Sequence, residues 1–267
     1  MSPEPRPATL DPVATTARLT AAMRALESRR PDRLFDDPLA ATLAGEQGMA
    51  MLAHAEAGDI IPVRTRWVDE QITAVLDGPI DQVVILAAGM DTRAWRLEAL
   101  AGVRLLELDR PELLALKAEL SGGWTPLAER TPLGVDLTGP WPDALAAAGH
   151  DPSRPTCWLV EGLLQYLPAP QVERLLERTT ALSAPGSHLV TDVVGAALLE
   201  VLRPSPMLTR FAELGMPWVF GSDDPAGLVA AHGWSAAVSR FGEVAAALGR
   251  TPPGGDGPDG YLVHATR

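Results

Sequence analysis

The chain has 267 residues, 46% of them hydrophobic, which suffices for one large α/β domain with extra segments or for two small domains. A formal net charge of −12 and an isoelectric point of about 4.8 argue against nucleic acid and anionic membranes as partners, and no apolar run is long enough to span a membrane. One cysteine, Cys157, excludes an internal disulfide, and the start "MSPEPRPATLDP" lacks the pattern of a secretion signal, so a cytoplasmic protein is expected.

The first quarter of the chain has the pattern of helices. Helix-forming residues with apolar positions at 3.6-residue spacing predict four helices, at Val13–Ser28, Pro38–Ala44, Met49–Ala57 and Pro62–Asp77. We therefore divide the chain into an N-terminal helical arm or lid, residues 1–60, and an α/β domain, residues 61–267.

From residue 81 onward strands and helices alternate, which predicts a parallel, doubly wound sheet. The predicted strands are Asp81–Ala88, Val103–Asp109, Thr131–Leu137, Thr156–Glu161, Ser187–Val194, Trp234–Arg240 and Tyr261–Arg267. The predicted helices between them are Thr92–Leu100, Pro111–Leu120, Pro142–Gly149, Pro170–Ser183 and Gly242–Gly249. Residues 195–233 form a mostly helical insertion within this domain.

Residues suited to an adenosine cofactor follow the first four strands, where ligands bind in open α/β sheets. Gly89 lets a ligand approach the backbone, and Asp109, twenty residues later, is placed to accept hydrogen bonds from ribose hydroxyls. Asp136 and Leu137 fit the adenine amino group and ring, and Glu161 fits an ammonium. The sequence therefore predicts one cofactor site along this edge of the sheet.

Each of these residues also has an ordinary structural explanation, as a turn glycine or a helix cap, so only their combination supports a site. A dinucleotide site would need a G-x-G-x-x-G loop, whereas "AAGMDTR" has one glycine, and Asp91 would repel a phosphate. S-adenosylmethionine has ribose and adenine without phosphate and fits better. Its amino-acid tail requires a cation for the carboxylate and an anion or carbonyls for the ammonium.

Five segments occur in a distinctive order: "RTRWVDE", "ILAAGMDTRAWRL", "LLELDRPELLALK", "GVDLTGPWPDAL" and "LVEGLLQYLP". With them the chain resembles the leucine carboxyl methyltransferase family from about Thr16 to Ala184. The bacterial members of that family include S-adenosylmethionine-dependent O-methyltransferases, some in polyketide pathways. The resemblance implies a class I methyltransferase fold, a Rossmann-like and mostly parallel sheet whose last strand is antiparallel. It also implies a function in secondary metabolite biosynthesis.

The resemblance further implies which residues contact the cofactor. They are Arg64 at the methionine carboxylate, Gly89 beside the methionine portion, Asp109 at the ribose, Asp136 and Leu137 at the adenine, Glu161 at the ammonium, and Tyr166 near the same tail. Where many relatives read "ASG" or "GAG", this chain reads "AAG". The insertion at 195–233, where acceptor selectivity would lie, has no clear match.

A small-molecule carboxylate, methylated to an ester, is the acceptor we expect. Its reference pKa of about 4 means that it arrives ionised and needs no general base. A hydroxyl acceptor would usually need one, for which Tyr166, His54 and His232 are weak candidates, so hydroxyl and carbon acceptors stay open. Arginines of the first helix, such as Arg24, offer a cation for the acceptor, or else lie on a solvated face.

Other functions and groups are less compatible with the sequence. A non-catalytic binding protein of the same fold would be expected to have lost a cofactor residue, and an NAD-dependent oxidoreductase would need other glycine spacing. The histidine, cysteine and aspartate residues do not occur in pairs with the spacing of metal ligands. His188 and His264 fall in predicted strands as packed residues, and His150 is expected to be exposed. The oligomeric state is left open.

Overall fold

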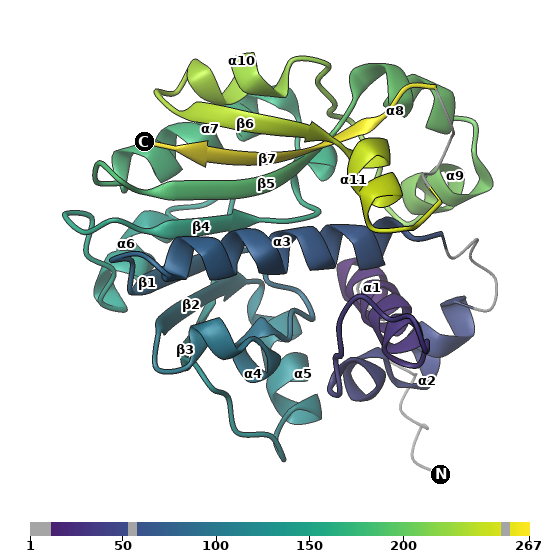
Figure 1. Cartoon of the computed structure of the whole chain (residues 1–267), viewed down its shortest axis with the longest axis horizontal. Helices are drawn as coiled ribbons and strands as arrows, with labels where there is room; N and C mark the ends of the chain where they lie inside the picture. Colours follow the sequence, from purple (N-terminus) through teal and green to yellow (C-terminus); the bar gives the residue numbers. More distant parts are fainter. Residues whose placement is uncertain (1–11, 53–57, 252–256) are drawn as a thin grey trace, which may run out of the picture.

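In the computed structural model, which describes residues 12–52, 58–251 and 257–267, seven strands form one sheet in the order β3-β2-β1-β4-β5-β7-β6 (Figure 1). The strands are β1 Gln82–Leu86, β2 Arg104–Asp109, β3 Glu129–Gly134, β4 Cys157–Val160, β5 His188–Val194, β6 Ser235–Arg240 and β7 Gly260–Thr266. β7 runs antiparallel to both β5 and β6, whereas the other five strands, β3, β2, β1, β4 and β5, are parallel to one another. The doubly wound sheet with an antiparallel last strand is thereby confirmed.

The central strands are covered on both faces, which explains their continuous apolar sequences. Every residue of β1 ("QVVIL") and of β4 ("CWLV") is buried. One face packs against α3 (Ile60–Leu76), α4 (Arg93–Arg96) and α11 (Phe241–Ala247). The other packs against α6 (Trp141–Ala147), α7 (Ala169–Ala181) and α10 (Pro225–Ala230), and Figure 1 shows α3 lying across the first face.

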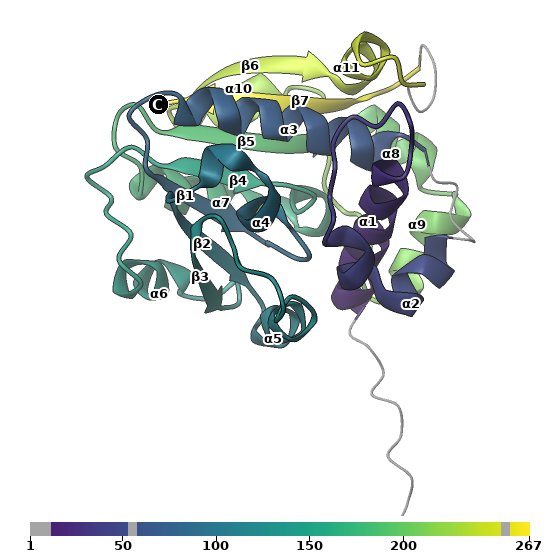
Figure 2. The same ribbon diagram turned by 60° about the horizontal axis from the view of Figure 1, so that its bottom comes forward.

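The N-terminal helices lie beyond the end of the sheet (Figure 2). α1 (Pro12–Ser28) and α2 (Ala40–Leu52) pack on each other and share an apolar cluster with Met90 and with α5 (Pro111–Leu120). Two separate helices were predicted where α2 lies, the first ending at Gly45, and α2 does consist of two helical segments that meet at Gly45, whose backbone (φ 59°, ψ −176°) is not helical. Glycine has no Cβ and adopts this positive φ without steric cost, so the first segment ends there and the chain turns into the second.

The insertion is helical as predicted and contains α8 (Ala196–Leu202), α9 (Pro206–Glu213) and α10. The predicted helix Thr92–Leu100 is wrong in its second half, because Leu97 is extended (φ −91°, ψ 105°) and a 3-10 turn, η1 (Glu98–Leu100), follows it. Asp136 and Leu137 lie in the loop after β3, because that strand ends at Gly134. Among the described residues, no helix combines the length and apolarity needed to cross a bilayer.

Candidate functional site

A cavity of about 310 Å³ opens where the carboxyl ends of β1, β2 and β4 meet the N-terminal helix α1. The seven residues predicted to contact the cofactor all line it: Arg64, Gly89, Asp109, Asp136, Leu137, Glu161 and Tyr166. They come from α3 and from the ends of four different strands, so the parallel sheet has gathered residues up to 102 positions apart in the chain around one space, Arg64 and Tyr166 being the outermost. Its volume lies at the lower end of the range for small-molecule sites, about 300–1,000 Å³.

The loop after β1 has two residues in the left-handed region. Gly89 has a φ of 46°, and Ala87, which carries a side chain, has a φ of 58°. Left-handed geometry costs an alanine about 1–2 kcal/mol, so this loop stores strain beside the cavity. The strain is held partly by a hydrogen bond of 2.7 Å from the Gly89 amide to the Asp109 carboxylate.

Asp109 ends β2 and is oriented by the backbone on both of its oxygens. Oδ2 accepts the Gly89 amide and Oδ1 accepts the Arg110 amide, each at 2.7 Å. Burial raises the pKa of Asp109 above its ordinary value, against these two hydrogen bonds and the charge of Lys117. Each carboxylate oxygen keeps a further lone pair, so the group can still accept hydrogen bonds from two neighbouring hydroxyls.

Asp136 lies at the end of the cavity nearest β3. Its Oδ1 accepts both the amide and the hydroxyl of Thr138, at 2.8 and 2.7 Å, which lowers its pKa. Because both hydrogen bonds use Oδ1, Oδ2 is left to accept from a ligand such as an exocyclic amine. Leu137, the next residue, adds an apolar surface to the same part of the lining.

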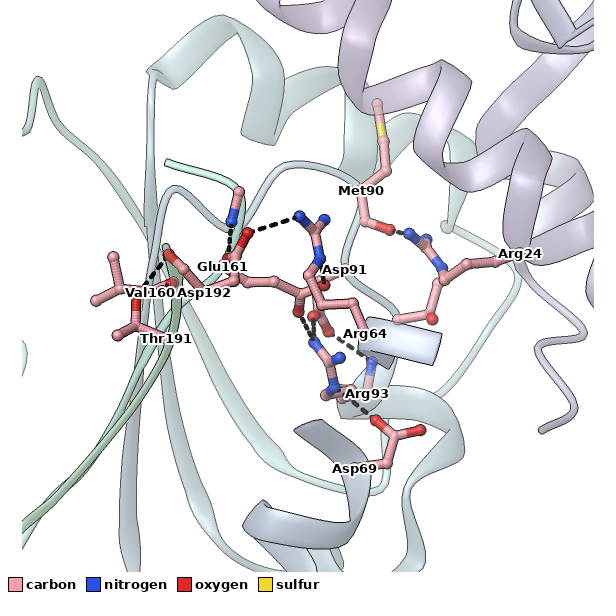
Figure 3. Close-up of polar contacts among 12 residues, drawn as sticks. Arg24, Arg64, Asp69, Met90, Asp91, Arg93, Val160, Glu161, Thr191 and Asp192 are labelled. Atoms are coloured by element: carbon pink, nitrogen blue, oxygen red, sulfur yellow. Dashed lines mark hydrogen bonds and ion pairs between the residues drawn. The ribbon is translucent and has the colours of Figure 1, made fainter. Parts of the chain in front are cut away.

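Glu161, just after β4, lies between two guanidinium groups (Figure 3). Arg64 Nε donates to Oε1 and Arg93 Nη1 donates to Oε2, both at 2.8 Å. Burial alone would raise the pKa of Glu161, but the charges of Arg93 and Arg64 outweigh it and hold the pKa below its ordinary value. The carboxylate is therefore ionised at neutral pH and can accept one more cationic donor.

Arg64 is oriented by a second carboxylate, Asp192 of β5, to which its Nη1 donates at 3.1 Å. Asp192 also accepts the Gly162 amide at 2.6 Å, which fixes the turn after Glu161. Strand-end reasoning missed Asp192 because β5 runs on to Val194. Its pairing with β4 stops at Thr191, however, so Asp192 is the first residue beyond the parallel part.

Arg93 joins the loop after β1 that contains Gly89, called here the glycine loop, to α3. Its guanidinium contacts Asp91, Glu161 and Asp69, the last through Nε at 2.7 Å. Burial would raise the pKa of Asp91, but Arg93 and Lys117 lower it to about 2. Asp69 lies within the segment "RTRWVDE", where nothing local indicates a role, and only the fold shows that it pairs with Arg93 and Arg96 of another segment.

Helix α1 forms one wall of the cavity with Thr16, Ala17, Thr20 and Arg24. The sequence suggested Arg24 as a cation that could bind an acceptor, but its side chain is already hydrogen-bonded within the protein. Nε donates to Asp37 at 2.8 Å, and Nη2 donates to the Met90 carbonyl. These contacts join α1 to the glycine loop, and Figure 3 shows Arg24 reaching Met90 from its helix.

Tyr166 lines the cavity from the 3-10 turn η2 (Leu164–Tyr166). Its ring packs edge-on against Trp218 of the insertion, with centroids 6.2 Å apart. Burial raises the pKa of its phenol, which therefore keeps its proton at neutral pH. Met216 brings the insertion to the cavity as well, near the Thr16 hydroxyl of α1.

The histidines do not meet at this cavity in the described part of the chain. His54 lies outside the described residues, and His232 Nε2 donates to the Glu173 carboxylate of α7 at 2.7 Å, away from the lining. His188 and His264 contact each other at 2.8 Å, as packed strand residues. The expectation of an exposed His150 is wrong: it is 5% exposed and contacts Thr156 beside Trp158, because its loop folds back over β4. No group of three or more possible metal ligands occurs among the described residues.

Comparisons with known proteins identify the family and the fold of this chain. A model of the family described as leucine carboxyl methyltransferase matches residues 17–180. A protein of Parafrankia sp. (strain EAN1pec), named putative S-adenosyl-L-methionine-dependent methyltransferase, is 42% identical over 96% of this chain and 87% of its own. One of the same name from Rhodococcus jostii (strain RHA1) is 38% identical, covering 90% and 89%. The crystal structure of a putative methyltransferase from Thermobifida fusca YX has the same fold, with a TM-score of 0.65 and 16% identity over all of this chain and 99% of that one.

Proposed function

Because this chain belongs to the leucine carboxyl methyltransferase family and is an S-adenosylmethionine-dependent methyltransferase, we propose that it methylates a carboxylate of a small secondary metabolite to give a methyl ester. One observation carries the choice of acceptor: the described lining of the cavity contains no histidine, and its carboxylates Asp91, Glu161 and Asp136 have pKa values held below their ordinary range.

The residues fit each part of the methyl donor. Arg64 carries the cation for the methionine carboxylate, and Glu161 and Asp91 carry the anions for the ammonium. Asp109, held by two backbone amides, accepts the ribose hydroxyls, and Asp136 accepts the adenine amino group. We assign these roles to the residues from their charge, free lone pairs and order along the cavity.

A hydroxyl acceptor would need its proton removed during transfer. Asp91, Glu161 and Asp136 have lowered pKa values and would be weak bases, whereas Tyr166 has a raised pKa and is neutral. Asp109 has a raised pKa but is engaged by two amides on the ribose side. A carboxylate, which is already ionised, requires none of them.

In the transfer a carboxylate oxygen forms a bond to the methyl carbon, and the carbon–sulfur bond breaks with its electron pair going to sulfur. The products are the methyl ester and S-adenosylhomocysteine, and no proton moves. The protein's contribution is alignment of the two reactants, which can supply much of the rate. Tyr166, neutral and half-buried beside the methionine end, donates a hydrogen bond that orients the incoming carboxylate.

The acceptor reaches the donor between α1 and the insertion. Thr16 and Thr20 on one side and Met216 on the other give this part of the cavity hydroxyls and an apolar thioether. We assign a lid function to the N-terminal segment 1–60, because α1 both lines the cavity and is joined to the glycine loop through Arg24. An acceptor that is apolar apart from its carboxylate suits such a lining.

The test uses S-adenosylmethionine labelled on its methyl group. The purified protein is incubated with aromatic and aliphatic acids, each beside the alcohol of the same carbon skeleton. Methyl esters release labelled methanol on treatment with alkali, whereas methyl ethers do not. We expect base-labile label with acids only; base-stable transfer to the alcohols, with none to the acids, would overturn the carboxylate assignment.

A further inference from the structure

Asp69 of α3 forms a buried ion-pair cluster directly behind the methionine end of the site. Its Oδ1 accepts from Arg93 Nε at 2.7 Å and from Arg96 Nη2 at 3.1 Å, and its Oδ2 accepts from Arg96 Nη1 at 2.6 Å. The Asp69 side chain is 10% exposed and is not among the residues that line the cavity. It therefore acts on any ligand only through its arginines.

Arg93 passes the effect of Asp69 into the cavity. Its side chain is 2% exposed, and it lines the cavity beside Asp91 and Glu161. Nε points back to Asp69, while Nη1 donates to Glu161 Oε2 at 2.8 Å and to Asp91 (Figure 3). Because a guanidinium is a rigid planar fork, fixing Nε also fixes the direction of Nη1.

We propose that Asp69 is a positioning residue for the methyl donor: by holding Nε of Arg93, it sets Glu161 and Asp91 in the orientation that receives the ammonium of the methionine tail. The inference rests on the proposed function of the same site. It adds a residue that touches neither donor nor acceptor and that lies five positions after Arg64 on the same helix.

The charges support the same direction of effect. Arg93 faces three carboxylates, and Asp69 is the one that does not line the cavity. An Asn at position 69 is neutral, and its amide nitrogen would point at one of the two arginines. Arg93 would then turn or carry more uncompensated positive charge beside Glu161, and either change weakens binding of a cationic ammonium.

The experiment compares two probes by calorimetric titration of the full chain. S-adenosylhomocysteine carries the amino-acid tail, and 5′-methylthioadenosine shares the adenosine and sulfur but lacks that tail. For D69N we expect affinity for S-adenosylhomocysteine to fall about tenfold, the scale of one charge-assisted hydrogen bond, with affinity for 5′-methylthioadenosine unchanged within about twofold. The ratio of the two affinities is the readout, because a purely structural defect would lower both.

Glu70 provides the matched control. It is the next residue of α3, its side chain is 45% exposed, and it pairs only with exposed Arg66 among the contacts of the described chain. E70Q makes the same charge change and should leave both affinities unchanged. If D69N is not folded, D69E carries the test, because it keeps the charge but shifts the carboxylate by one methylene; a threefold or larger fall in the ratio is expected.

Three results separate the possible failures. An unchanged ratio in D69N, or in D69E where that variant carries the test, overturns the positioning role. So does an equal fall with E70Q, since the effect would then be general electrostatics. A wild-type protein that binds neither probe instead contradicts the donor site itself, and so the proposed function.

Discussion

Replacing Asp109 with Asn tests the ribose end of the proposed donor site most directly. In the wild-type chain each carboxylate oxygen accepts one backbone amide at 2.7 Å, from Gly89 and from Arg110, and the side chain is buried. Asn has one oxygen, so its amide nitrogen must face one of these two donors. The residue would then lose an acceptor for a ribose hydroxyl as well as its charge.

The expected loss follows from the hydrogen bond removed. A hydrogen bond to a charged group contributes about 1.5–3 kcal/mol, so D109N should weaken S-adenosylhomocysteine binding by roughly 2 kcal/mol, or about 30-fold. Isothermal titration calorimetry measures this, and E112Q, an exposed position in the first turn of α5, makes the same charge change as a control. Binding by D109N within about threefold of wild type would refute the ribose assignment.

Three further predictions concern stability, each measured by urea denaturation. The left-handed conformation of Ala87 costs the folded state about 1–2 kcal/mol, which A87G removes, whereas the added backbone entropy of glycine stabilises the unfolded state by about 0.5–1 kcal/mol. We therefore expect the free energy of unfolding to rise by roughly 0.5 kcal/mol, and a clear decrease would contradict the reasoning. K117M removes the single lysine, fully buried 2.8 Å from Glu107, and should cost about 3 kcal/mol; a loss below 1 would show that Arg130, the second partner of Glu107 at 2.8 Å, compensates its charge alone. Burial lowers the pKa values of His188 and His264, so the unfolded chain binds more protons and stability should fall as pH drops below about 6.5; an H264Q variant with the same pH dependence would exclude this pair as the cause.

The candidate site could be located from the sequence because parallel strands bring their carboxyl ends to one edge. Gly89, Asp109 and Glu161 each follow a strand that the hydrophobic pattern identifies, and the fold places all three on one cavity. Arg64 and Tyr166 were recognised only through the family resemblance, since nothing local marks an arginine on α3 or a tyrosine after β4 as neighbours. Their position at the cavity is confirmed, while their roles toward the donor remain predictions.

Residues that act through other residues could not be found in this way. Asp192 lies inside β5 by its strand pattern, and its access to the site depends on where the pairing with β4 stops. Asp37 is buried and accepts from Arg24 and Thr92, which lie on different segments. His150 was predicted to be exposed because it is a polar residue in a loop, but packing of that loop buries it.

Local sequence by itself determined the strands and helices, their order along the chain, and the strand-end residues that line the cavity, because burial on both faces imposes apolar runs and their ends require turns. Only the tertiary structure decided which charges pair. An ion pair depends on distances between segments, and Arg24, Arg64 and Arg93 lie within reach of several carboxylates that no local pattern distinguishes. The pairing of Arg24 and Arg93 follows from packing of α1 and α3 against the loop that contains Gly89.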